Sequence, residues 1–154
     1  MKPLTYEQAL SRMTALCSAS EHSECEIREK LQRAAMAEPD INRVVDFLYD
    51  EGYLDTLRYC RAFAHDKLCF AHWGRIKIQQ ALRMKGLPQD DIRCALDELP
   101  EDEYRAVLEQ LLEQKARSLS DDDDEYTHTG KLLRFAAGRG FTFDEISKSL
   151  PLSS

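Results

Sequence analysis

Apolar side chains recur along this chain at the three- and four-residue spacing of amphipathic helices. Ile41, Val44, Val45 and Leu48 stand at positions i, i+3, i+4 and i+7. A second stripe has the same spacing and comprises Tyr104, Val107, Leu108, Leu111 and Leu112. No segment alternates cleanly between apolar and polar residues, and β-branched residues are sparse. The pattern predicts an all-α protein.

Start and stop signals for helices lie at the ends of these stripes. Pro39 and Pro88 suit first helical turns, where a backbone N–H is not needed. Capping boxes are predicted at Thr5–Gln8, Ser23–Glu26 and Thr142–Glu145. Glycines that end helices in the left-handed conformation are predicted at Gly52, Gly86 and Gly140. These signals predict nine helices, near residues 5–18, 23–36, 39–51, 55–70, 73–85, 88–98, 101–118, 128–139 and 142–150.

Four core positions in the first third of the chain recur after 51 residues and again after a further 54. The three sets are Ile27, Leu31, Ile41 and Val45; Ile78, Leu82, Ile92 and Leu96; and Leu132, Ala136, Ile146 and Leu150. Gly86 and Gly140 recur as well, and Ala35 holds their place in the first copy. We therefore expect a tandem array of three three-helix repeats, elongated or curved. The expected repeats are 1–52, 53–99 and 100–154.

The 154 residues suffice for a folded core without disulfides or metals. No apolar run approaches the roughly 20 residues that span a bilayer, and the N-terminus lacks the apolar core of a signal peptide. Five cysteines is an odd count, and there is no C-x-x-C motif. We expect a cytoplasmic protein with reduced thiols that acts as a monomer.

Charge is distributed unevenly along the chain. The formal net charge is −7, which argues against generic coating of DNA. Residues 56–93 carry eight Lys and Arg against three acids, whereas residues 97–126 carry twelve acids against three basic residues. Four consecutive acids, Asp121–Asp124, predict a solvated loop over 118–126. A basic segment beside an acidic one suggests a surface that binds a charged partner. The alternative is that the two segments form solvated helix faces of opposite charge.

Motifs of catalysis and nucleotide binding are missing from the sequence, so we expect neither an enzyme nor a cofactor. Cys60, His65, Cys69 and His72 have zinc-compatible side chains. On a continuous helix, however, Cys60 would point away from the other three and join an apolar stripe. Helix packing with incidental histidines is the preferred interpretation, and a metal- or thiol-based sensor is the alternative.

Trp73, the one tryptophan, lies at a predicted helix start beside Arg75 and Lys77. An exposed aromatic ring among basic residues could stack on a base or enter a protein pocket. The preferred interpretation is that Trp73 packs between two repeats and that Gly74 permits their close approach. Arg75 and Lys77 stay candidates for partner contact.

Three stretches of the sequence carry a set of motifs at matching places in the three expected repeats. The central one runs from Leu54-Asp55 through Tyr59-Cys60 and Phe63 to Trp73-Gly74-Arg75, Ile78, Leu82 and Lys85-Gly86-Leu87. The opening stretch comprises Cys17-Ser18, Glu21, Ile27 and Lys30-Leu31. The closing stretch comprises Gly130-Lys131-Leu132, Arg139-Gly140-Phe141, Asp144 and Ile146. Together these stretches resemble the RecX family of recombination regulators, in which Ala is usual at the position of Cys60.

The resemblance implies three tandem three-helix repeats and a cytoplasmic bacterial regulator of the RecA recombinase. Such a regulator binds the RecA filament, limits its growth and suppresses ATP hydrolysis and strand exchange in recombination, DNA repair and the SOS response. Single-stranded DNA could be contacted through the filament; a helical module that binds nucleic acid directly is the alternative. We expect partner contacts from the basic residues of the central repeat: Arg58, Arg61, Arg75, Lys77, Arg83 and Lys85.

Overall fold

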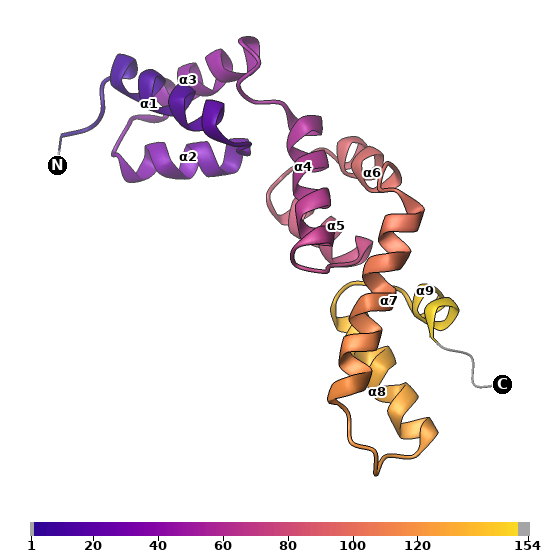
Figure 1. Ribbon diagram of the computed structural model, residues 1–154. Coiled ribbons are helices and arrows are strands. Elements are labelled where there is room, and N and C mark those ends of the chain that lie inside the picture. Colours follow the sequence, from indigo (N-terminus) through magenta and orange to yellow (C-terminus); the bar gives the residue numbers. More distant parts are fainter. Residues whose placement is uncertain (1, 151–154) are drawn as a thin grey trace.

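The computed structural model describes residues 2–150, and within this range the chain has nine helices and no strand. They are α1 (Tyr6–Ala19), α2 (Glu24–Arg33), α3 (Glu38–Asp50), α4 (Thr56–Cys69), α5 (Arg75–Met84), α6 (Gln89–Asp97), α7 (Glu101–Ser118), α8 (Glu125–Gly138) and α9 (Phe143–Ser149). Figure 1 shows them in groups of three that follow one another along an elongated array. We name these groups the first unit (α1–α3), the central unit (α4–α6) and the third unit (α7–α9). No helix in the described range is long and apolar enough to cross a membrane.

Helix ends follow the signals read from the sequence. All three predicted capping boxes form, at the starts of α1, α2 and α9. Pro39 lies in the first turn of α3, as predicted, whereas Pro88 lies one position earlier, as the N-cap of α6. The clearest difference from the predicted boundaries is the start of α8, which was expected near residue 128 and lies at Glu125. The helix begins there because the Asp124 carboxylate accepts a hydrogen bond from the Thr127 amide at 2.7 Å. The predicted acidic loop is therefore shorter, and its last aspartate caps a helix.

The turn that ends the second helix is the same in all three units. Ala35, Gly86 and Gly140 hold it with φ of 62°, 81° and 99°. In each unit the following residue donates its N–H to a carbonyl five residues earlier, as in a Schellman motif. The three bonds are Met36 to Leu31, Leu87 to Leu82 and Phe141 to Ala136. The sequence repeat therefore corresponds to a repeated backbone structure.

The repeated apolar positions form the cores of the array. All are buried except Leu150, which is half-buried. The first unit has a core of its own, built from α1, α2, α3 and the following Leu54. The central and third units share one continuous core, to which Tyr104 and Phe141 contribute rings 5.2 Å apart. The two junctions between units therefore differ in kind.

Polar side chains join the first unit to the central unit. The Tyr59 hydroxyl donates to Glu26 at 2.7 Å, and Lys85 Nζ lies 3.2 Å from the same carboxylate oxygen. Arg58 Nε lies 2.5 Å from Glu21. Burial alone would raise the pKa of Glu26, but the hydrogen bonds from Tyr59 and Lys85 outweigh it and hold this pKa below its ordinary value. The junction therefore depends on an ionised carboxylate.

Backbone contact joins the central unit to the third unit. The Gly74 N–H donates to the Arg139 carbonyl at 2.8 Å, and the Ile76 N–H donates to the Gly140 carbonyl at 3.1 Å. A Cβ atom on Gly74 would lie 2.5 Å from the Gly140 oxygen. The predicted role of Gly74 in close approach is confirmed.

Candidate partner-binding surface

Four of the six basic residues expected to contact a partner are engaged within the chain. Arg61 forms a two-point ion pair with Glu98, at 2.6 and 2.8 Å. The other pairs are Arg58–Glu21, Arg58–Asp55, Lys85–Glu26, Arg75–Glu101 and Arg75–Glu145. The two remaining residues, Lys77 and Arg83, form no ion pair within the described part of the chain. The net positive charge of the central sequence is therefore partly neutralised in the fold.

Arg75 is the most enclosed of the four paired residues, with its side chain 23% exposed. Its guanidinium lies 2.8 Å from Glu101, 3.2 Å from Glu145 and 3.9 Å from the centre of the Tyr104 ring. Its backbone N–H donates to the Tyr104 hydroxyl at 3.1 Å. Burial raises the pKa of Tyr104, so the phenol stays protonated and donates to Glu145. Arg75 is thus a structural link between the central and third units.

Aromatic rings and lysines gather where α4 turns into α5. The half-buried Trp73 ring packs edge-on against Phe63, with ring centroids 6.4 Å apart. Lys67 and Lys77 place their ammonium groups 4.7 and 4.8 Å from the centre of the Trp73 ring. Neither lysine pairs with a carboxylate among residues 2–150. Phe63, Lys67, Trp73 and Lys77 form what we call the aromatic–lysine surface.

Lys67 is a member of this surface that sequence reasoning missed. A signal was present, because Phe63–Lys67 and Trp73–Lys77 are both i, i+4 pairs of an aromatic ring and a lysine. The spacing does not predict the turn between α4 and α5 that brings these two pairs together. The Trp73 N–H donates to the Lys67 carbonyl at 3.0 Å, and His72 takes a positive φ of 58°. This turn brings both lysines to one ring.

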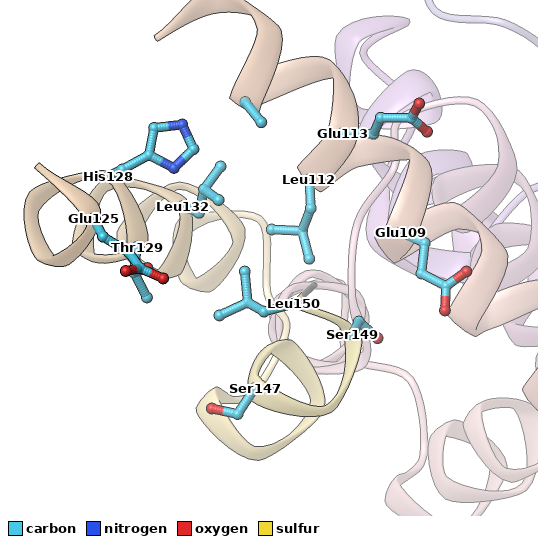
Figure 2. Close-up of a pocket in the computed structure, with 11 residues that line it drawn as sticks. Glu109, Leu112, Glu113, Glu125, His128, Thr129, Leu132, Ser147, Ser149 and Leu150 are labelled. Atoms are coloured by element: carbon cyan, nitrogen blue, oxygen red, sulfur yellow. The ribbon is translucent and has the colours of Figure 1, made fainter. Parts of the chain in front are cut away.

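A cavity of about 560 Å³ lies between the three helices of the third unit. Figure 2 shows Leu112, Leu132 and Leu150 together in it, with Glu109 and Glu113 of α7 nearby. An apolar interior beside carboxylates disfavours phosphate and other anions. The cavity therefore does not extend the basic surface of the central unit.

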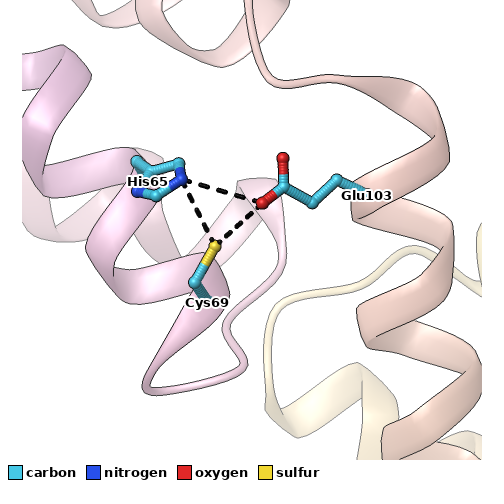
Figure 3. A group of neighbouring side chains, drawn as sticks. All are labelled: His65, Cys69 and Glu103. Carbon is cyan, nitrogen blue, oxygen red and sulfur yellow. Dashed lines mark hydrogen bonds and ion pairs between the residues drawn. The ribbon is translucent and has the colours of Figure 1, made fainter.

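The four residues considered as metal ligands separate in the structure. Cys60 is buried in the core, as its apolar stripe predicts, and burial raises the pKa of its thiol to about 11. His72 lies beyond the last residue of α4, so the face that it would share with His65 and Cys69 is interrupted. His65 and Cys69 instead meet Glu103 of α7 (Figure 3). Sequence spacing gave no sign of Glu103, because it comes from the next unit.

The fold and these surfaces define a helical-repeat protein of the solenoid class, with three three-helix units in series. Family models described as the first, second and third three-helix domains of RecX match residues 9–48, 57–96 and 101–150. The chain belongs to the RecX family of regulatory proteins.

Curated relatives match most of this chain. The regulatory protein RecX of Vibrio campbellii is 32% identical over 135 residues, which cover 88% of this chain and 84% of that protein. The regulatory protein RecX of Clostridium botulinum is 31% identical over 125 residues, which cover 80% of this chain and 58% of that longer protein. The crystal structure of RecX from Lactobacillus salivarius superposes with a TM-score of 0.81 at 17% identity, covering 94% of this chain and 93% of that one. A second RecX crystal structure gives a TM-score of 0.83 at 21% identity, covering 93% of this chain and 71% of that one.

Proposed function

We propose that this chain regulates the RecA recombinase by binding its filament on DNA. Binding limits filament growth and thereby lowers ATP hydrolysis and strand exchange in recombination and DNA repair. The observation that carries the proposal is the match of three RecX family models, in order, over nearly the whole chain. The RecA partner follows from the resemblance of the sequence to that family.

The shape of the molecule supports this role. Units in series expose a long surface relative to their mass, which suits contact with more than one protomer of a filament. The elongated path of the nine described helices is visible in Figure 1. The first and central units meet through polar contacts rather than through a shared core.

We assign the partner contact of the central unit to Lys67, Lys77 and Trp73, with Arg83 as a further contact. The cationic groups of Lys67, Lys77 and Arg83 form no ion pair with any described residue, so binding an acidic surface or a DNA phosphate breaks no internal ion pair. Tryptophan is enriched among the residues that contribute most to binding at protein interfaces, and the two lysines beside it add positive charge that suits an acidic partner. Arg58, Arg61, Arg75 and Lys85 are already paired with carboxylates of this chain.

The test is DNA-stimulated ATP hydrolysis by the host recombinase, titrated with wild-type protein, Lys77→Glu and Arg12→Glu. Lys77 lies in the first turn of α5, where an acidic residue suits the helix dipole, so the variant should fold. We expect Lys77→Glu to require roughly tenfold more protein for the same inhibition, equivalent to about 1.4 kcal/mol. Arg12→Glu, an exposed change of the same charge in the first unit, should behave as wild type.

The dose of wild-type protein distinguishes two modes of action. Inhibition well below one molecule per recombinase protomer supports blocking of growing filament ends, whereas inhibition near one per protomer supports coating of the groove. If wild-type protein has no effect on growing or preformed filaments, the proposed function is wrong. Tight DNA binding without the recombinase would then support the direct nucleic-acid reading.

A further inference from the structure

Three side chains of zinc-binding types converge where α4 passes α7. His65 and Cys69 stand one helical turn apart on α4, and Glu103 projects toward them from the start of α7 (Figure 3). The Cys69 sulfur lies 3.6 Å from His65 Nε2 and 3.3 Å from Glu103 Oε1. His65 Nε2 lies 3.7 Å from the same carboxylate oxygen. The three donor atoms thus form a nearly equilateral triangle.

The triangle has the size that tetrahedral zinc requires. With Zn–S near 2.3 Å, and Zn–N and Zn–O near 2.1 Å, tetrahedral angles separate the donor atoms by about 3.4–3.6 Å. The three observed separations agree with this to within about 0.3 Å. An ion could therefore enter without a rearrangement of either helix.

The surroundings of His65 also favour metal binding. The Asp66 carboxylate lies 3.8 Å from Nδ1, on the side of the ring away from the thiol. This distance is too long for a hydrogen bond, but the negative charge on that side of the ring favours a proton on Nδ1, which leaves Nε2 free to bind a metal. The His65 and Glu103 side chains are 55% and 43% exposed, so the cluster is open to solvent and to an entering ion.

A similar cysteine–glutamate pair elsewhere in the chain lacks these properties. Cys94 donates to Glu98 at 3.3 Å, the same separation as in Cys69–Glu103. Both oxygens of Glu98, however, accept hydrogen bonds from Arg61. No third donor joins this pair among the described residues. It therefore provides an internal control for an exposed thiol beside a carboxylate.

We infer that His65, Cys69 and Glu103 bind a Zn²⁺ ion that joins the central unit to the third unit. The thiol gives up its proton on binding, and the fourth position stays open to water or to a donor from a partner. The bound ion crosslinks α4 to α7 on the face of α4 that carries His65 and Cys69, whereas Lys67, two residues from each, projects from the opposite face of the helix. Zinc binding thus stiffens the contact between the central and third units. Binding of the ion by these three residues does not depend on which partner the chain binds.

Cobalt provides a direct test of the ligand set. The reduced, chelator-treated protein is titrated with Co²⁺ and then with Zn²⁺. We expect one equivalent of Co²⁺ to produce the visible bands of tetrahedral coordination and the near-ultraviolet band of a thiolate ligand, and Zn²⁺ to abolish both. Cys69→Ser should abolish the thiolate band, and His65→Ala should lower affinity by at least the roughly 10–100-fold that loss of an outer partner costs. Cys94→Ser should bind as wild type.

Thermal unfolding tests the link between the units. Zn²⁺ should raise the midpoint of unfolding of the wild-type protein, because it binds the folded state in preference to the unfolded one. Glu103→Gln, which removes only the ligand from the third unit, should lose most of this rise while unfolding normally without metal. Absence of stoichiometric binding, or binding that survives Cys69→Ser, overturns the site. Unchanged stabilisation in Glu103→Gln overturns the bridge between units.

Discussion

Ala35 holds a backbone conformation for which its counterparts in the other two units are glycines. Its φ is 62°, and it ends the second helix of the first unit as Gly86 and Gly140 end theirs. A left-handed conformation costs an L-residue roughly 1–2 kcal/mol, because its Cβ approaches the following carbonyl. The first unit tolerates this cost because the Schellman hydrogen bonds around Ala35 are intact.

Replacing Ala35 by glycine should therefore stabilise the first unit, by about 1 kcal/mol after the greater chain entropy of glycine is subtracted. Ala34→Gly is the matched control, because Ala34 has an ordinary φ of −81° and gains nothing from glycine. The measurement is the midpoint of unfolding in urea, with the loss of helix monitored by circular dichroism. Equal shifts in the two variants would contradict the argument.

At the scale of the element, α5 is a helix whose first turn is capped by another unit. Its N-cap is Gly74, which has no side chain to cap the helix. The Arg75 N–H donates to the Tyr104 hydroxyl, and the Ile76 N–H donates to the Gly140 carbonyl. Since free N–H groups at a helix start are costly when buried, docking of the third unit and formation of this turn are coupled.

Gly74→Ala should open this junction. Its Cβ would lie 2.5 Å from the Gly140 oxygen, so backbone must move, at an expected cost of about 1–3 kcal/mol. Gly86→Ala is the comparison, because a Cβ there meets no atom within 4 Å and costs only the roughly 1–2 kcal/mol of a left-handed alanine. Hydrogen exchange distinguishes the two variants. The amides of Arg75 and Ile76 should exchange faster than in the wild type in Gly74→Ala, but not in Gly86→Ala. Protection equal to wild type would refute the coupling.

At the scale of the whole molecule, the array is apolar at one junction and polar at the other. The central and third units share a core, whereas the first unit meets the central unit through Glu26, Tyr59, Lys85 and the Arg58–Glu21 pair. Hydrophobic burial persists over a wide range of pH, but an ionised carboxylate does not. Acid should therefore loosen the first junction before the second.

The pH dependence has a definite sign. The folded pKa of Glu26 is below its ordinary value of 4.5, so its contribution is complete above that value and is lost as pH falls through the folded pKa. The distance between fluorescent labels on α1 and α6 should increase over this acidic range. Glu26→Gln should show the increased distance already at neutral pH and lose much of the acid transition. Glu29→Gln, an exposed control on the same helix, should retain the wild-type profile.

Features that depend on neighbours within about five residues could be predicted from the sequence. The capping boxes, the helix-ending turns and the three-fold repetition are of this kind, because a cap or a Schellman turn is closed by the local chain. The apolar repeat also predicted the buried positions, since helical spacing determines which residues share a face. The resemblance to the RecX family depends on the same local patterns.

The tertiary structure alone decided which charged and polar side chains meet. Arg75 and Glu145 are 70 residues apart, and Cys69 and Glu103 are 34 apart. Their contacts depend on how helices of successive units cross, which apolar spacing within a helix does not determine. Charge counting therefore predicted a basic central unit, but only the packed helices show that Arg58, Arg61, Arg75 and Lys85 are neutralised by carboxylates, most of them from neighbouring units. The same packing leaves Lys67 and Lys77 beside Trp73 without a carboxylate partner among the described residues.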